Sequence, residues 1–449
     1  MKRGKKLLTM LLALAVILGA TYAATLLNPE NEAEEETSAT IFTVNADEVT
    51  GIRWDYSEPL SFTKENDAWV YDEDAAFPVD ETFLDTMLAE VKEITASKTI
   101  EGVEDWDQYT LEVPICEVTL TAGEDAYTIK IGEETSLGGE RYLSIGDGNA
   151  YLVDADILDA FCYGLYDVLA YETVPEMETI TAMEHTGKDS YRIDYLENSG
   201  LAYSDEYVWF IGEKPLDTEL TDRLMTYVTD STWQSCANYN AEDLSQYGLD
   251  DPAATITMYY LEDGTEKTYT LEIGAQAEAG YYARIQGSGM VYTLSDSVAE
   301  TLVYTTYEEL QPDEVLLMDW DEVKSMEITL DGETYKISRT TETVTDDEGN
   351  ETEEVVYKLG GVEVDAASIP EVLDELESTG YANGLTPERS EEIRFVFNRE
   401  RDTFPEVELA FCQYNSTSCL VTLNGEATVF VAREDVVDLV ETVNALVLK

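Results

Sequence analysis

The sequence predicts an α+β protein: an N-terminal transmembrane helix followed by three tandem α+β repeats, each an antiparallel meander sheet with a capped helix. A charge-free apolar segment follows a basic start, which predicts the transmembrane helix. The motifs of one stretch then recur further along the chain, and each copy combines period-2 strands with helices of period 3.6. Strands in one sheet with segregated helices are typical of the α+β class.

The first element is the apolar segment at residues 7–27, which contains no charged residue. Its length corresponds to about 31 Å of helix, close to the thickness of a hydrocarbon core. Residues 1–6 carry four Lys or Arg residues, which favours a cytoplasmic N-terminus. We therefore expect an uncleaved anchor, an acidic tether at 28–46, and the rest of the chain outside the cytoplasm. The alternative is a cleaved signal peptide, with Thr21-Tyr22-Ala23 as a poor cleavage site.

The repeats are clearest in one pair of motifs. DQYTLEVP at 107–114 recurs as SQYGLDDP at 245–252, and YTIKIG at 127–132 recurs as YTLEIG at 269–274. A third copy is more diverged: the opening DEVTGIRW recurs as DEVKSMEI, but the QYxL motif decays to GYANGLTP. We therefore expect α+β repeats at 47–170, 171–310 and 311–449, each long enough to hold its own core.

Each repeat reads in the same order. An alternating strand opens it, with apolar positions at Val49, Ile52 and Trp54 in the first copy. A second strand and an aromatic third strand follow; the third reads AWVY, VWFI and VVYKL in the three copies. After the helix, the QYxLxxP stretch connects to a meander of strands such as ICEVTLT and TITMYYL. A short terminal helix closes the repeat.

An Asp precedes the helix in each copy: Asp80, Asp217 and Asp365. A carboxylate in this position accepts a hydrogen bond from the free N–H groups of the first turn, so we expect three N-caps. An apolar stripe at i, i+3, i+4 and i+7 begins at Leu84 in the first copy and at Ile369 in the third. These helices should therefore pack on the sheets of their own copies.

The charge balance limits the classes of partner. The chain has 95 Asp and Glu residues against 26 Lys and Arg residues, a net charge of −69. Such a chain repels nucleic acid, so we expect no nucleic-acid partner. Hydrophobic residues make up 44%, which excludes a disordered acidic chain. A solvated acidic surface is one interpretation, and weak, diffuse binding of Ca²⁺ or Mg²⁺ is the other.

The residues that catalysis commonly needs are few. His185 is the single histidine, and the repeats place it in the slot of Trp54 and Ile328, so we expect a half-buried structural role. Ser61 and Lys64 match S-x-x-K, but they fall in a predicted strand and the partner motifs of that enzyme class are missing. We therefore expect no enzyme, and no catalytic, cofactor-binding or metal-binding residue and no cofactor.

The five cysteines form no C-x-x-C motif. Cys412 and Cys419 could face each other across a hairpin as a disulfide; buried free thiols are the alternative, and they fit the remaining three.

The basic start, the DEVTGIRW strand and the paired QYxL and IG motifs resemble a bacterial family known as domain of unknown function 4340. The resemblance covers residues 41–310 well and the rest loosely. It implies an anchored, exported protein of the kind encoded beside ABC transporters of the gliding-motility type, and hence an accessory role with transporter subunits as partners. It implies no catalytic residue.

These observations lead to two expected functions. The first is a membrane-anchored, extracytoplasmic, non-enzymatic interaction protein, an accessory of an ABC transporter. The second is an extracytoplasmic binding module for cell-wall glycan or an exported solute, because seams between repeats can form clefts and exposed Tyr and Trp can stack on sugars.

Overall fold

The computed structural model describes residues 38–345, 351–382 and 384–447. The predicted basic segment at 1–6 and the predicted anchor at 7–27 lie outside the described residues. Among the residues that the structure does describe, no helix combines the length and apolarity needed to cross a membrane. The chain divides into two compact units, with the boundary between Glu172 and Thr173.

The predicted acidic tether is too long at its C-terminal end. Ala39–Thr43 form strand β1, which pairs antiparallel with β5, Glu93–Ala96. Phe42 is buried, and its ring lies 5.4 Å from that of Tyr127. Burial of this aromatic ring favours an ordered strand over a solvated tether, so the prediction of a tether through residue 46 is wrong from Ala39 onward.

The first unit contains a large antiparallel sheet with the strand order β4-β3-β2-β7-β8-β9-β10-β6. A 3₁₀ turn, η1 (Ala46–Glu48), leads into its central strand β2. Its strands are β2 (Val49–Asp55), β3 (Pro59–Glu65), β4 (Ala68–Tyr71), β6 (Lys98–Ile100), β7 (Cys116–Ala122), β8 (Asp125–Glu134), β9 (Glu140–Ser144) and β10 (Ala150–Asp154).

The second unit contains two further antiparallel sheets, with the orders β14-β13-β12-β11-β16-β17-β18-β19-β15 and β23-β22-β21-β20-β25-β26-β27-β28-β24. The strands of the former are β11 (Thr179–Thr186), β12 (Ser190–Tyr195), β13 (Trp209–Ile211), β14 (Lys214–Pro215), β15 (Ser235–Asn238), β16 (Ala254–Glu262), β17 (Thr265–Gln276), β18 (Tyr281–Ile285) and β19 (Val291–Leu294). Those of the latter are β20 (Val323–Leu330), β21 (Glu333–Thr345), β22 (Glu351–Leu359), β23 (Val362–Val364), β24 (Gly380–Tyr381), β25 (Glu391–Arg399), β26 (Glu406–Gln413), β27 (Ser418–Leu423) and β28 (Glu426–Ala432).

The three large sheets share one strand order, except that the first has no counterpart of the edge strands β14 and β23. In each, the opening strand pairs with the first strand of the later meander: β2 with β7, β11 with β16, and β20 with β25. The strand that follows the helix (β6, β15 or β24) lies at the far edge and pairs with the last meander strand. The predicted mixed α+β class with antiparallel sheets is confirmed, but a simple meander is an incomplete description because this edge strand crosses over.

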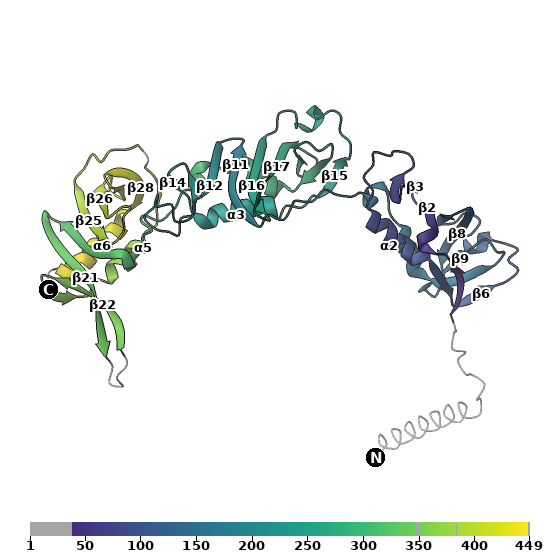
Figure 1. Ribbon diagram of the computed structural model, residues 1–449, viewed down its shortest axis with the longest axis horizontal. Coiled ribbons are helices and arrows are strands. Elements are labelled where there is room, and N and C mark those ends of the chain that lie inside the picture. The colour runs from purple at the N-terminus through teal and green to yellow at the C-terminus, as the bar shows by residue number, and fades with distance from the viewer. Residues whose placement is uncertain (1–37, 346–350, 383, 448–449) are drawn as a thin grey trace, which may run out of the picture. The chain divides into compact units, whose positions relative to one another are not determined.

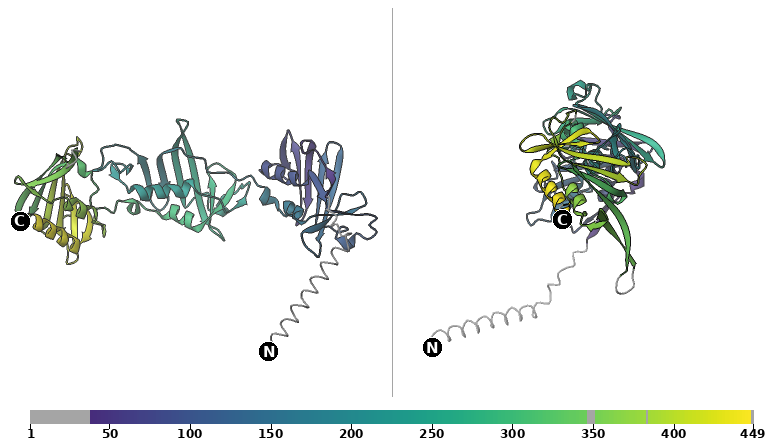
Figure 2. Two further views of the ribbon diagram at one scale, coloured as in Figure 1. Left: turned by 90° about the horizontal axis from the view of Figure 1, so that it is seen from below. Right: turned by 90° about the vertical axis from the view of Figure 1, so that its left-hand side faces the viewer.

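The helices are α2 (Glu81–Val91), α3 (Thr218–Thr229), α4 (Asp296–Tyr304), α5 (Ser368–Asp374) and α6 (Arg433–Val447). In the second unit, α3 packs beside α4 and α5 beside α6, and each pair covers one face of its sheet (Figures 1 and 2). In the first unit, α2 lies beside a 3₁₀ segment, η3 (Ala155–Phe161), in place of a terminal α-helix. The apolar stripe of α2 is buried as predicted.

Two of the three predicted N-caps are present. Asp80 accepts a hydrogen bond from the N–H of Phe83 at 3.1 Å, and Asp217 accepts one from Leu220 at 2.6 Å. The prediction for Asp365 is wrong, because α5 begins only at Ser368. An N-cap at Asp365 would place Pro370 beyond the first turn, where proline removes a helical hydrogen bond.

The QYxL turn packs directly on the strand that carries the IG motif. QYxL begins as a 3₁₀ turn, η2 (Asp107–Tyr109) or η5 (Ser245–Tyr247), and its Leu is buried. A Cβ built on Gly132 or Gly274 would lie 2.3 Å from the carbonyl oxygen of the motif Tyr. The glycine on the strand therefore lets the turn lie directly on the sheet, which explains why the two motifs recur together.

Candidate functional site

His185 takes a structural position in the second sheet. It lies opposite Ile256 on β16, as Trp54 lies opposite Val118 and as predicted from the repeats, but it is fully buried instead of half-buried. Its Nδ1 lies 2.9 Å from the Asp189 carbonyl oxygen, and its Nε2 lies 2.6 Å from that of Leu302. The imidazole thereby connects the opening hairpin to the terminal helix α4.

Ser61 and Lys64 both lie on strand β3, as predicted. The Ser61 hydroxyl donates to the Asp72 carboxylate, and the Lys64 amine lies 4.7 Å from the centre of the Trp69 ring. In the S-x-x-K enzymes the serine opens a helix, so this strand geometry does not match theirs.

The five cysteines, all of which lie in the described ranges, form no disulfide, and the hairpin register explains why Cys412 and Cys419 are not bonded. Cys412 lies opposite Leu420, and Cys419 lies opposite Gln413, so the two thiols occupy adjacent positions on opposite faces of the sheet. Burial raises the pKa of Cys116 and of Cys419 to about 12 in each case. These two thiols are therefore protonated and unreactive at neutral pH.

An insertion in the second sheet docks on the third sheet of the same unit. Residues 196–208 connect β12 to β13, where the first sheet has only the turn Asn66–Asp67. The buried side chain of Arg399, on β25, donates to the Tyr203 carbonyl at 2.6 Å and to the Glu322 carboxylate at 2.5 Å. Both bonds come from Nη2, while Nε and Nη1 are buried without a partner, so it is Nη2 that links the insertion to the third sheet.

Further contacts extend this junction. Arg401 pairs with Asp205 of the insertion and, at 3.2 Å, with Asp319. The rings of Tyr203 and Phe404 meet edge to face at 4.7 Å. The second and third sheets are therefore joined by a network of charged and aromatic side chains, which neither sheet provides alone.

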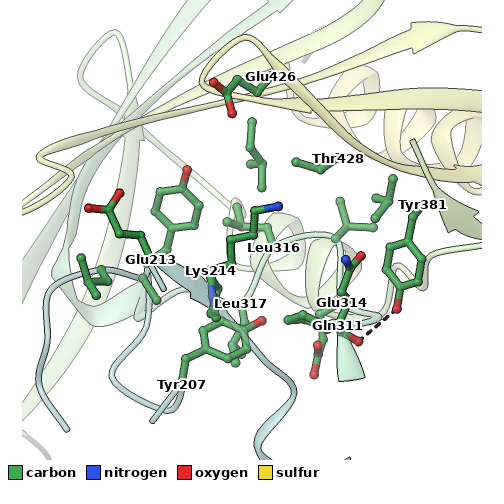
Figure 3. A pocket seen from close by; sticks show the side chains of 18 of the residues that line it. Tyr207, Glu213, Lys214, Gln311, Glu314, Leu316, Leu317, Tyr381, Glu426 and Thr428 are labelled. Atoms are coloured by element: carbon green, nitrogen blue, oxygen red, sulfur yellow. Dashed lines mark hydrogen bonds between the residues drawn. The ribbon is translucent and has the colours of Figure 1, made fainter. Parts of the chain in front are cut away.

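A cavity of about 360 Å³ lies beside this junction (Figure 3). It has aliphatic and aromatic walls, and its size falls at the lower end of the range for small-molecule sites. The Lys214 amine also lines it and lies 5.4 Å from the centre of the Tyr307 ring. The Tyr381 hydroxyl donates to the Gln311 carbonyl at 3.0 Å. Its aromatic residues are Tyr203, Tyr207, Tyr307, Tyr381 and Phe404.

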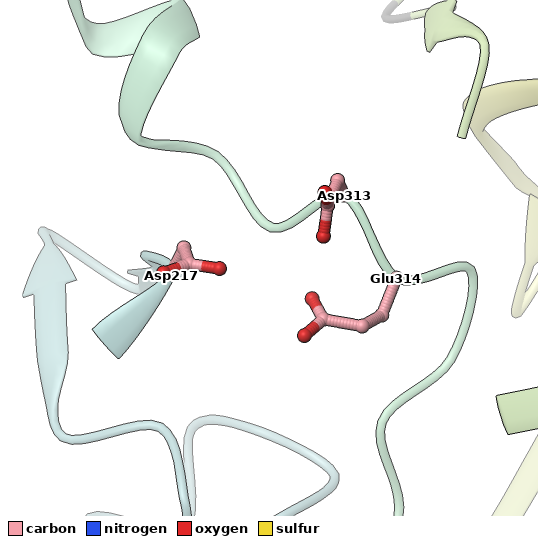
Figure 4. A group of neighbouring side chains, drawn as sticks. All are labelled: Asp217, Asp313 and Glu314. Atoms are coloured by element: carbon pink, nitrogen blue, oxygen red, sulfur yellow. The ribbon is translucent and has the colours of Figure 1, made fainter. Parts of the chain in front are cut away.

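An acidic hollow lies at the start of α3 and shares Tyr207, Glu314 and Leu317 with this cavity. Carboxylate oxygens of Asp217, Asp313 and Glu314 all lie within 4.8 Å of one another and point toward one space (Figure 4). Burial is the largest influence on the Glu314 carboxyl and raises its pKa; the charges of Asp217 and Asp313 raise it further, while its own backbone N–H opposes them. Like charges held this close repel one another unless a cation or proton lies between them.

The sequence predicts a possible cleft at a seam between repeats, where this cavity lies, but it predicts none of the lining residues of the cavity and does not predict the acidic hollow. Their residues come from the 196–208 insertion, the β13–β14 hairpin, the cap and first turns of α3, η6 (Tyr307–Leu310) with the linker after it, and the third sheet. No motif spacing connects segments so far apart in the sequence. The one feature of the sequence that could have indicated them is the insertion, because the first repeat has only a short turn at the same place in the alignment.

The described residues define a protein of tandem antiparallel sheets, each with helices on one face. The chain belongs to the family described as Domain of unknown function (DUF4340), whose model matches residues 69–170 and 212–395. This match confirms the resemblance that the QYxL and IG motifs indicate, and it extends into the third sheet. No curated protein and no solved structure matches the chain.

Proposed function

We propose that this chain is a membrane-anchored, extracytoplasmic, non-enzymatic interaction protein that acts as an accessory of an ABC transporter. The observation that carries the proposal is the sequence of its first part: four basic residues and a charge-free segment at 7–27 precede a strongly acidic folded chain. Such a start anchors a protein with its bulk outside the cytoplasm. The transporter partner rests on the family resemblance.

The modular fold supports an interaction role. We propose three tandem repeats at 47–170, 171–310 and 311–449, each built around the opening strand of its own sheet. The shared strand order supports this division. So do the separate buried clusters around Met183 in the second sheet and Met326 in the third. Repeated modules offer several surfaces to partners without requiring a reactive group.

The test is purification of the full-length chain, tagged at its C-terminus, from native membranes in several detergents. Transporter subunits should copurify with it, and they should be missing when an unrelated single-pass protein carries the same tag. Failure to recover any transporter subunit in every detergent would contradict the accessory role.

The cavity favours a second function, the binding of cell-wall glycan or an exported solute. Its aromatic rings could stack on sugar faces, and Gln311 offers a buried amide for hydrogen bonding. Calorimetric titration of the full-length chain with soluble peptidoglycan fragments should then saturate, and Tyr381→Ala should weaken binding. Titrations that show no saturation would exclude cell-wall glycan as the ligand.

A further inference from the structure

The acidic hollow brings together carboxylates from two parts of the second unit. Asp217 caps α3, and its backbone N–H donates to the Leu310 carbonyl at 2.9 Å. Asp313 and Glu314 belong to the linker that leads to the third sheet. The linker is held on the other side, because the Ser378 N–H donates to the Asp313 carbonyl at 2.8 Å and Glu314 forms a β-bridge with Glu377.

The negative charge of this cluster is not compensated by the protein. Within the described ranges, Asp217, Asp313 and Glu314 take part in no ion pair, although Arg223 lines the same hollow. The Oε2 atom of Glu314 is buried without a hydrogen-bond partner. A buried carboxylate oxygen without a donor costs free energy, so this position favours a positively charged ligand.

Tyr207, which lines both the cavity and the hollow, is a second residue whose surroundings suit a ligand. Its side chain is 8% exposed and lines the hollow together with the three carboxylates. Among the described residues its hydroxyl has no hydrogen-bond partner. Burial raises the pKa of this phenol, and the charge of Glu314 is the next largest cause, followed by that of Asp217. The hydroxyl oxygen itself is not among the fully buried polar atoms, so it can bond to solvent, and a hydrated cation beside the carboxylates would supply a bound water as its partner.

The spacing of the oxygens suits Ca²⁺. Oxygen ligands lie at about 2.3–2.6 Å from Ca²⁺, so two ligands on opposite sides are separated by about 5 Å. The three carboxylates lie within that limit, and water and backbone carbonyls can complete the shell of about 6–8 oxygens. Mg²⁺ demands shorter distances and near-ideal octahedral geometry, which a capping Asp and a linker pair suit less well. Capping leaves Asp217 able to bind a cation, because a carboxylate has about four lone-pair sites.

From this geometry we propose that Asp217, Asp313 and Glu314 bind a Ca²⁺ ion that fastens the linker to the start of α3. The ion would join the second and third sheets at a place distinct from the Arg399 network. Three carboxylates and a partly exposed position correspond to a dissociation constant on the order of 0.1–1 mM, the range of extracellular modules.

The first unit supplies a matched control. There Asp80 caps α2 as Asp217 caps α3, and its backbone N–H donates to the Val168 carbonyl at 2.9 Å, as that of Asp217 donates to Leu310. In the described part of this unit, however, no carboxylate cluster forms around Asp80. Asn caps a helix as well as Asp does, so Asp80→Asn removes a charge at a cap without touching the proposed site.

The test is calorimetric titration of the full-length chain with CaCl₂ and, separately, MgCl₂, at about 0.1 M salt to screen diffuse binding. The wild-type chain and Asp80→Asn should each show one saturable Ca²⁺ site. Asp313→Asn should weaken it at least tenfold, and because Asp313 is exposed this substitution should not disturb folding. Glu314→Gln should act in the same direction.

A second experiment measures hydrogen exchange at the backbone amides of the linker. Ca²⁺ should slow hydrogen exchange at the amides of Asp313 and Glu314 in the wild-type chain, and should not do so in Asp313→Asn. Uptake without saturation, or equal saturation in Asp313→Asn, would overturn the site and leave only diffuse binding by the acidic surface. Saturation by MgCl₂ at the same concentrations would overturn the assignment to Ca²⁺.

Discussion

At the scale of single residues, two glycines determine whether the most specific motif of the chain can pack. Gly274 on β17 lies under the Tyr247 carbonyl, and Gly132 on β8 lies under that of Tyr109. Neither glycine has a positive φ, so the requirement at these positions is space and not an unusual backbone conformation.

We predict that Gly274→Ala lowers the free energy of unfolding of the second unit by about 1–3 kcal/mol or more, because the methyl group meets a backbone oxygen that cannot rotate away. The control is Gly289→Ala in the same sheet region, where the nearest atom to a new Cβ lies at 3.7 Å. Its effect should remain within about 0.5 kcal/mol. Urea unfolding measures both, and equal midpoints for the two variants would contradict the packing role.

The buried thiol of Cys116 predicts a pH dependence. Its pKa is raised to about 12 in the folded chain, chiefly by burial, against about 8.5 for a free thiol. Below about pH 8.5 the thiol is protonated in both states and the folded chain keeps its full stability. As the pH rises toward 12, the thiol ionises in the unfolded chain only, so the free energy of unfolding falls. Between pH 8 and 10 the wild-type chain should lose about 2 kcal/mol more than Cys116→Ala. Parallel stability curves for the two proteins would contradict the prediction.

At the scale of elements, the sequence predicts the strands and helices well because their patterns are local. The opening strands, the aromatic third strands and the helices at Asp80 and Asp217 lie where periodicity and capping chemistry indicate. The start of α5 was missed because the Pro370 restriction outweighs the cap at Asp365. The edge position of β6, β15 and β24 was missed because pairing with a distant strand leaves no local pattern.

The effects of Asp80→Ala and Asp365→Ala on stability can be compared directly, because only Asp80 caps a helix. Asp80→Ala should lower the stability of the first unit by about 0.5–2 kcal/mol, because it removes the hydrogen bond to the Phe83 N–H. Asp365→Ala should change the stability of the second unit by less than about 0.5 kcal/mol, because Asp365 caps no helix. Differential scanning calorimetry measures both. A larger loss for Asp365→Ala than for Asp80→Ala would contradict this assignment of the caps.

At the scale of the whole molecule, the candidate sites depend on contacts that the sequence does not reveal. Asp217 and Asp313 are far apart in the chain, and only the linker geometry brings their carboxylates together. The same is true of Arg399 and the 196–208 insertion. Composition could predict an acidic surface and diffuse cation binding, but it could not predict which carboxylates converge.

The central claim is an acidic modular protein anchored in the membrane with its bulk outside the cytoplasm. The most direct measurement is protease treatment of intact, wall-free cells that express the full-length chain with a C-terminal tag, followed by an alkaline wash of the membranes. We predict that the tag is digested without permeabilisation and that undigested chain stays in the membrane pellet. A tag protected until the membrane is permeabilised would contradict the outward orientation, and release by the wash would contradict the anchor in favour of a cleaved signal peptide.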